Sequence, residues 1–152
     1  MKKIVLILGL MTFGMQAQGV SVLKYSVSTS LMEYLKEYID ELDYYGIDYS
    51  FGDNLTLEIY DISRVRGEGS VAGIALGMYD NSRVEVYIDK EVWRVSNSRQ
   101  KKWTVYHELS HDIFNVQHCA VRLMDTTVPD NISYSLMKNS IEELMIYLKE
   151  NN

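Results

Sequence analysis

The chain has 152 residues, of which 47% are hydrophobic and 24% are charged, and its formal net charge is −6. This length and composition are typical of one globular domain that can fold without disulfides, and the single cysteine, Cys119, excludes an internal disulfide. The negative charge opposes binding to a polyanion, and one short basic cluster at 99–102 does not reverse it, so we expect no nucleic-acid partner.

The first residues have the features of a secretory signal peptide. Lys2 and Lys3 precede an uncharged and mostly apolar run at 4–15, and small residues follow at Ala17 and Gly19. The run is shorter than the roughly 20 residues that a transmembrane helix needs. An N-terminal core helix or a retained anchor is the alternative interpretation of this run.

We therefore predict a signal peptide at 1–19, with cleavage after Gly19 or after Ala17. The mature protein would be a single domain at 20–152 that is exported to the periplasm or the medium and keeps no membrane anchor. Loss of the two lysines would change the formal net charge from −6 to −8.

The next segments predict a helix followed by a strand. Apolar and aromatic side chains recur at helical spacing over 28–45, which predicts an amphipathic helix that ends at Gly46. Residues 54–62 alternate between apolar and polar side chains, as a strand with one buried face does. The polar, glycine-containing segment at 64–70 is expected to be a loop.

Two strands and a long helix should follow. The segments at 73–79 and 83–89 have strand-like sequences, and the turn-rich tripeptide between them is typical of a hairpin. A helix should begin near Ser96 or Ser98 and run to about Asn115.

The C-terminal part of the chain predicts one more helix. A connector at 124–133 contains the only proline of the sequence, and apolar residues recur at helical spacing over 135–149. Together the elements predict an α+β fold in which helices cover a small, mixed and twisted sheet.

The clearest functional signal is the sequence His-Glu-Leu-Ser-His at 107–111. On a helix, His107 and His111 lie about 5–6 Å apart on one face, so both imidazoles can bind one ion. Catalytic zinc has three protein ligands and keeps one position for water. The carboxylate of Glu108 could take a proton from that water, which predicts a single Zn²⁺ with Glu108 as the general base.

A third ligand is needed, and His118 is the natural candidate. On a straight helix, His118 would lie about 10 Å beyond His111 along the axis and could not share the ion. The helix must therefore end, and Asn115 suits that role because asparagine tolerates the left-handed conformation. The alternative third ligands are acidic: Glu142, Glu143 and Asp125.

Residues 107–118 resemble the extended zinc motif of the zincin metallopeptidases. They are close to the metzincin pattern, but Asn115 replaces the turning glycine and the third histidine comes one residue later. The same longer spacing is found in small, largely uncharacterised bacterial and viral metallopeptidases, and the similarity extends over about 73–125. The resemblance implies a small zincin-like domain that hydrolyses peptide bonds in a protein or peptide substrate.

The resemblance also implies roles for two other segments. Met124 would form the methionine turn below the metal, although a plain core position is the alternative for this residue. Substrate would bind as an added strand along a sheet edge at 73–79, where Gly73, Ala75 and Gly77 would lie against it. A thin, twisted edge strand without a binding role is the alternative.

Several polar residues near the motif have open roles. Tyr134, Tyr87 and Arg122 could each stabilise an oxyanion, and the sequence does not choose among them. Asp112 would either orient a ligand histidine or be a solvated helix residue. Cys119 is expected to be a buried, inert thiol.

Peptide hydrolysis is the leading functional hypothesis, and two alternatives use the same motif. One is a zinc amidase that acts on amides outside peptide chains, such as formylated or cell-wall amides. The other is a non-catalytic zinc-binding module, against which the presence of Glu108 argues because structural zinc needs no base.

Overall fold

The computed structural model describes residues 24–62 and 71–152. The predicted signal peptide at 1–19 and the predicted loop at 64–70 therefore lie outside the described residues. Within the described part of the chain, no helix has the length and apolar character needed to span a membrane.

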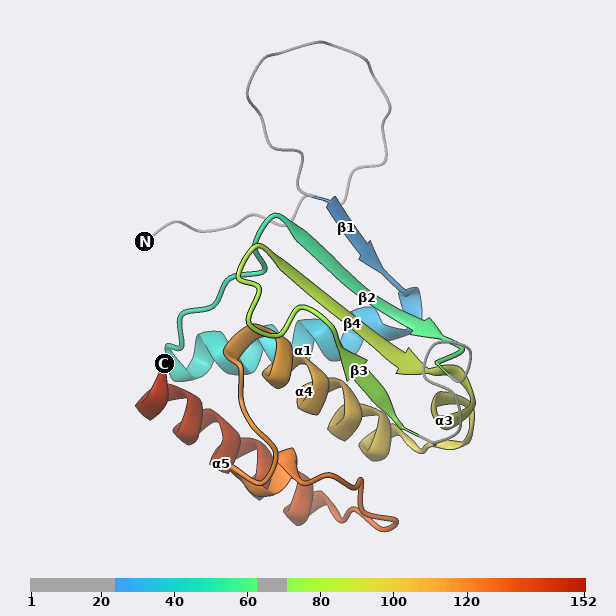
Figure 1. The fold of residues 1–152 in the computed structure, drawn as a ribbon. Coiled ribbons are helices and arrows are strands. Elements are labelled where there is room, and N and C mark those ends of the chain that lie inside the picture. Colours follow the sequence, from blue (N-terminus) through green and yellow to red (C-terminus); the bar gives the residue numbers. More distant parts are fainter. Residues whose placement is uncertain (1–23, 63–70) are drawn as a thin grey trace, which may run out of the picture.

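One mixed sheet organises the described part of the chain, with its strands in the order β1-β2-β4-β3 (Figure 1). Both β1 and β4 run parallel to the central β2, whereas β3 runs antiparallel to β4 at the edge of the sheet. The strands are β1 (Lys24–Val27), β2 (Asn54–Tyr60), β3 (Gly73–Ala75) and β4 (Arg83–Asp89).

Helices pack against one face of this sheet. Figure 1 shows α4 beneath β3 and β4, with α1 and α5 beside it. The helices are α1 (Met32–Tyr45), α3 (Lys90–Val95), α4 (Ser98–Phe114) and α5 (Tyr134–Asn151), and short 3₁₀ turns lie at Thr29–Leu31 and Arg122–Met124. The predicted α+β fold with a mixed sheet is confirmed.

The core lies between the sheet and the helices. Strand β4 alternates as the sequence predicts, because Val84, Val86 and Ile88 are buried while the residues between them are only partly buried. Opposite them, Leu109 and Trp103 of α4 are fully buried. The same alternation leaves the other face of β4 polar, so the helices cover one side of the sheet.

Local capping sets both ends of the long helix α4. The Asn97 side chain accepts hydrogen bonds from the backbone N–H groups of Arg99 and Gln100, and the Gln100 side chain accepts one from Asn97 N–H in return. At the other end, Asn115 has the left-handed conformation, with φ 56° and ψ 28°. The predicted end of this helix at Asn115 is confirmed.

Three elements differ most from the sequence prediction. The strand at Lys24–Val27 and the helix at Lys90–Val95 were not predicted, because both are too short to show a periodic pattern. The predicted strand at 73–79 ends at Ala75. Beyond it, the Gly77 N–H bonds to a side chain rather than to a strand, and Tyr79 has a positive φ that a strand does not allow.

Candidate metal centre

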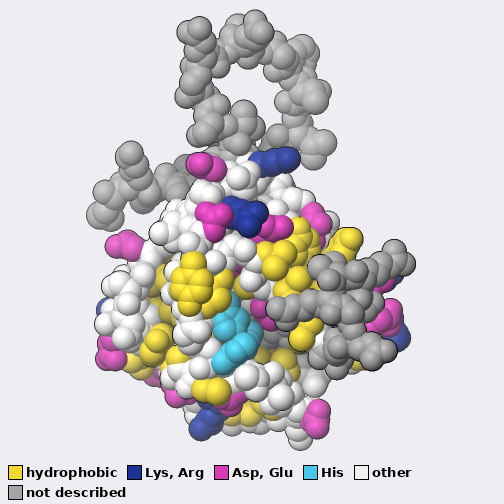
Figure 2. All heavy atoms as spheres, viewed as in Figure 1, with side chains coloured by type: hydrophobic (Ala, Val, Ile, Leu, Met, Phe, Trp, Pro, Cys, Tyr) yellow, Lys and Arg dark blue, Asp and Glu magenta, His cyan; other side chains and the backbone are white. Residues whose placement is uncertain are grey.

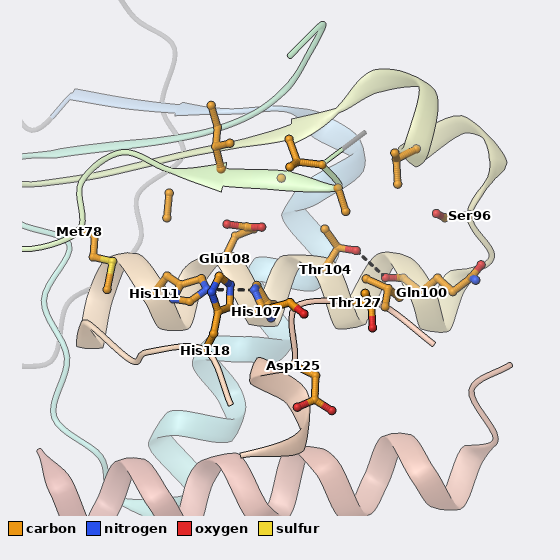
Figure 3. Close-up of a pocket in the computed structure, with 18 of the residues that line it drawn as sticks. Met78, Ser96, Gln100, Thr104, His107, Glu108, His111, His118, Asp125 and Thr127 are labelled. Atoms are coloured by element: carbon orange, nitrogen blue, oxygen red, sulfur yellow. Dashed lines mark hydrogen bonds between the residues drawn. The ribbon is translucent and has the colours of Figure 1, made fainter. Parts of the chain in front are cut away.

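The three histidines of the chain converge at one point. Each imidazole offers one nitrogen, and the three nitrogens all lie within 4.8 Å of one another. The Nε2 atoms of His107 and His111 are 2.9 Å apart, and the ring centroid of His118 lies 4.5 Å from that of His111. In Figure 3 the three imidazoles point toward one another. They are close enough to hold one metal ion, as the sequence predicted.

Two different backbone segments present these side chains. His107 and His111 are one turn apart on α4 and share its face. After Asn115 the chain reverses, and the N–H groups of Asn115 and Val116 both bond to the carbonyl of Ser110. This reversal brings His118 back beside the helix instead of carrying it about 10 Å away.

The Nδ1 atoms of the two helical histidines both form hydrogen bonds with backbone carbonyls. His107 Nδ1 lies 2.9 Å from the carbonyl oxygen of Leu123, and His111 Nδ1 lies 2.5 Å from that of Val116. A carbonyl can only accept, so each Nδ1 carries the proton and donates it. In a neutral ring the Nε2 atom then presents a lone pair, which is the form that binds metals.

The surroundings favour the neutral rings. Burial lowers the pKa of His107 to about 4 and also lowers the pKa of His111, while their hydrogen bonds to backbone carbonyls act in the opposite direction. At pH 7 both rings are therefore neutral, and two Nε2 lone pairs face each other 2.9 Å apart. A cation placed between them would remove this repulsion, so the donor set fits a metal.

Glu108 lies on the β3 side of the histidines, as Figure 3 shows. It is buried on α4, and the absence of a side chain at Gly73 makes room for it. A Cβ atom on Gly73 would lie 2.7 Å from Glu108 Cγ and 2.8 Å from its Oε1. Gly73 therefore packs closely against Glu108, and the approach of a substrate strand to this glycine stays a prediction.

Asp112 has neither of the roles considered from the sequence. It is buried, and its Oδ2 accepts hydrogen bonds from the backbone N–H groups of Gly77 at 2.7 Å and Glu85 at 3.3 Å. The Nδ1 atoms of His107 and His111 bond to carbonyls instead. Asp112 is thus not a solvated residue and does not orient a ligand histidine. It fastens the segment after β3 to α4, and burial raises its pKa.

The histidines and Glu108 line a cavity of about 610 Å³. One wall is the segment that contains β3, and the opposite wall includes Asp125 and Val128. Figure 2 shows histidine side chains reaching the surface near the middle of one face of the molecule. His118 is the exposed member of the cluster, whereas the other two histidines are largely buried. The metal centre would therefore be open to solvent from one side.

The acidic residues considered as third ligands lie elsewhere. Glu142 and Glu143 are exposed on α5, and neither belongs to the histidine cluster. Asp125 lines the cavity, but its carboxylate points away from the three imidazoles in Figure 3. The geometry favours His118 over these three as the third ligand.

Met124 is fully buried in the 3₁₀ turn that follows the histidines. Its neighbour Leu123 supplies the carbonyl for His107, so this turn contacts the site through its backbone. The role of Met124 as a methionine turn stays a prediction, and its burial equally suits a core residue.

The structure does not bring the oxyanion candidates to the cavity. Tyr87 donates a hydrogen bond to Glu85, Tyr134 is 74% exposed at the start of α5, and Arg122 is exposed as well. None of the three lines the cavity. The sequence could not place them because the face of each residue depends on tertiary packing.

The expectation for Cys119 was wrong, because its thiol is exposed. Cys119 has a positive φ of 62°, and its N–H bonds to the carbonyl of Met124. The tight turn after His118 therefore directs the side chain outward.

Tyr79, which was not predicted to belong to the site, contacts the segment that carries His118. Its backbone N–H donates to the side-chain oxygen of Asn115, and its hydroxyl accepts from the side-chain amide of Gln117. No sequence pattern marks such a contact, because the turn that contains Tyr79 meets the end of α4 only in the folded chain.

Comparison of the chain with protein-family models, with curated proteins and with solved structures finds no match.

Proposed function

We propose that this protein is a zinc-dependent metallopeptidase of the zincin type, with His107, His111 and His118 as ligands and Glu108 as the general base. The observation that carries the proposal is the convergence of three imidazole nitrogens within 4.8 Å beside a buried glutamate. A structural site needs no base beside it, whereas hydrolysis by an activated water does.

The donor set supports zinc. Three imidazoles with one open position are a known ligand set of catalytic zinc. Nitrogens that each lie about 2.0–2.1 Å from a tetrahedral ion are roughly 3.3 Å apart, which falls between the observed 2.9 Å and 4.8 Å. When bound there, zinc would polarise a substrate carbonyl and lower the pKa of a water molecule.

The position of Glu108 supports its role in proton transfer. It follows His107 directly on α4, and Gly73 leaves space for its carboxylate between the helix and β3. From there the carboxylate would accept a proton from the attacking water and return it to the leaving amine. His107 and His111 would do no proton chemistry of their own, because Nδ1 of each ring donates to a carbonyl and Nε2 would bind the metal.

The sheet edge supports an extended peptide as substrate. β3 pairs with β4 on one side and, among the described strands, with none on the other. The cavity lies along this edge and is lined by Gly73 and Ala75. A peptide that pairs with β3 would pass its carbonyl groups over the histidines and Glu108. The N-terminal sequence supports export, so such a substrate would be met outside the cytoplasm.

Metal analysis followed by a hydrolysis assay tests the proposal. The purified protein should contain one zinc per chain, and His111→Ala and His118→Ala should each lose most of it. Casein hydrolysis should stop with a chelator and return with zinc. Zinc binding with no hydrolysis of casein or peptides, but with release of formate or cell-wall amines, would favour an amidase. Zinc binding with no hydrolysis of any of these would leave a non-catalytic module.

A further inference from the structure

The third histidine is held differently from the other two. His107 and His111 each donate an Nδ1–H to a backbone carbonyl, and both stand on a capped helix. The His118 ring makes no hydrogen bond within the described part of the chain, and its aromatic contacts there are with the other two imidazoles. Its position must therefore come from its backbone, which lies in the short segment 115–119.

Backbone strain is concentrated around this segment. In the described part of the chain, the non-glycine residues with positive φ are Tyr79 at 67°, Asn115 at 56° and Cys119 at 62°. Asn115 and Cys119 flank His118, and Tyr79 contacts the same segment. Such conformations are rare for a bulky side chain like tyrosine, and they persist when the surrounding structure enforces them.

The contacts that hold Tyr79 and Asn115 in these conformations join the turn after β3 to the end of α4. Tyr79 is the third residue of a turn closed by the Asp80 N–H on the Gly77 carbonyl, where glycine is usual. Asn115 Oδ1 accepts from Tyr79 N–H at 2.5 Å, and the Gln117 amide donates to the Tyr79 hydroxyl. Both partners of Tyr79 thus come from the three residues just before His118.

We propose that Tyr79 is a positioning residue that, through Asn115 and Gln117, fixes His118 against the other two histidines. Glycine at position 115 would adopt the left-handed conformation more easily than asparagine. Asparagine adds a side-chain acceptor at that point, and the acceptor is used for Tyr79. The turn after β3 therefore holds the segment that carries His118. Through this contact, residues near β3 help to place the third histidine.

The proposal depends on the proposed function only through metal binding, and Asn115→Gly is its sharpest test. Glycine keeps the helix end but removes the contact with Tyr79. Zinc affinity, measured by competition with a chromophoric chelator, should fall about 10–100-fold, the range for partners that orient a ligand. The melting temperature of the metal-free protein should stay close to that of the wild type. Asn115→Asp, which keeps an acceptor, should bind zinc as tightly as the wild type, and Tyr79→Phe should show a smaller loss.

Asn97→Ala is the matched control at the other end of the same helix. It removes the cap of α4, so it should lower the melting temperature and leave the zinc affinity unchanged. Wild-type zinc affinity in Asn115→Gly would overturn the proposal while leaving the metal centre intact.

Hydrogen exchange in the metal-free protein separates this proposal from the proposed function. The amides of Tyr79 and of residues 116–119 should exchange faster in Asn115→Gly than in the wild type and Asn97→Ala. If the wild type binds no zinc, the proposed function fails. The positioning role of Tyr79 is then tested by the hydrogen-exchange comparison alone. Exchange at wild-type rates in Asn115→Gly would then overturn the positioning role.

Discussion

Two carboxylates on α4 stand in nearly the same local setting. Glu108 and Asp112 are one helical turn apart, both are buried, and each lies against a glycine of the segment that contains β3. A Cβ atom would come within 2.7 Å of Glu108 at Gly73 and within 2.5 Å of Asp112 at Gly77.

The two carboxylates differ in what they face. Asp112 accepts backbone hydrogen bonds from both β3-side and β4 residues, which makes it part of the framework. Glu108 lines the cavity with the three histidines, and Asp112 does not line this cavity. A glycine that lies against an acidic residue of the helix therefore indicates close packing. The neighbours of the carboxylate then distinguish a residue that stabilises the fold from one that faces the cavity. Four substitutions test this contrast.

The largest expected effect is on turnover in Glu108→Gln. The amide keeps the size of the side chain but cannot accept a proton, and a general base contributes about 10²–10⁴-fold to a rate. We expect kcat of peptide hydrolysis to fall by that factor while zinc content and melting temperature stay unchanged. Undiminished turnover, or zinc loss in this variant, would remove Glu108 from the role of base.

Asp112→Ala should affect stability more than any other change at these positions. It removes the acceptor of the buried Gly77 N–H and of the partly buried Glu85 N–H, and an unsatisfied buried donor costs about 1–3 kcal/mol. Urea unfolding should show a loss of at least that size. A stability equal to that of the wild type would mean that Asp112 is not part of the framework.

Gly77→Ala should lower the free energy of unfolding by about 1–3 kcal/mol, as overpacking of a well-packed interior does. The new methyl group would meet Asp112 Oδ1 at 2.5 Å and the backbone carbonyl of Arg83 at 2.8 Å, and neither can move freely. Thermal unfolding checks this. Full stability would show that the segment after β3 is looser than the contact implies.

Gly73→Ala should have the smallest effect on folding and a moderate one on turnover. The methyl group would meet the Glu108 side chain, whereas the methyl group of Gly77→Ala would also meet a backbone carbonyl, which yields less easily than a side chain. We expect about a tenfold fall in kcat, equal to about 1.4 kcal/mol, with zinc affinity retained. If stability falls instead while kcat is unchanged, the contrast between the two glycines disappears.

The sequence predicted the parts of this arrangement that depend on short-range patterns. The limits of β4 and the end of α4 at Asn115 follow from alternation and from the distance between the histidines. The convergence of the three histidines follows from the same distance argument, because His118 can meet the others only if the helix stops.

The parts that the sequence could not predict depend on tertiary contacts. β1 has four residues and forms by pairing with β2, so no pattern of its own marks it. Asp112 looks like a surface residue of a helix until Gly77 packs over it. Tyr79 and Cys119 adopt positive φ values that their residue types disfavour, and only the fold around them imposes those values.

Anomalous diffraction at the zinc edge, from a crystal of the zinc-loaded protein, tests the metal centre most directly. The account predicts a single zinc peak about 2.0–2.1 Å from one nitrogen of each of His107, His111 and His118, with one coordination position facing the cavity beside Glu108. A peak that lacks His118 and includes Asp125, Glu142 or Glu143 would contradict the ligand set, and no peak at the histidines would contradict the metal centre itself.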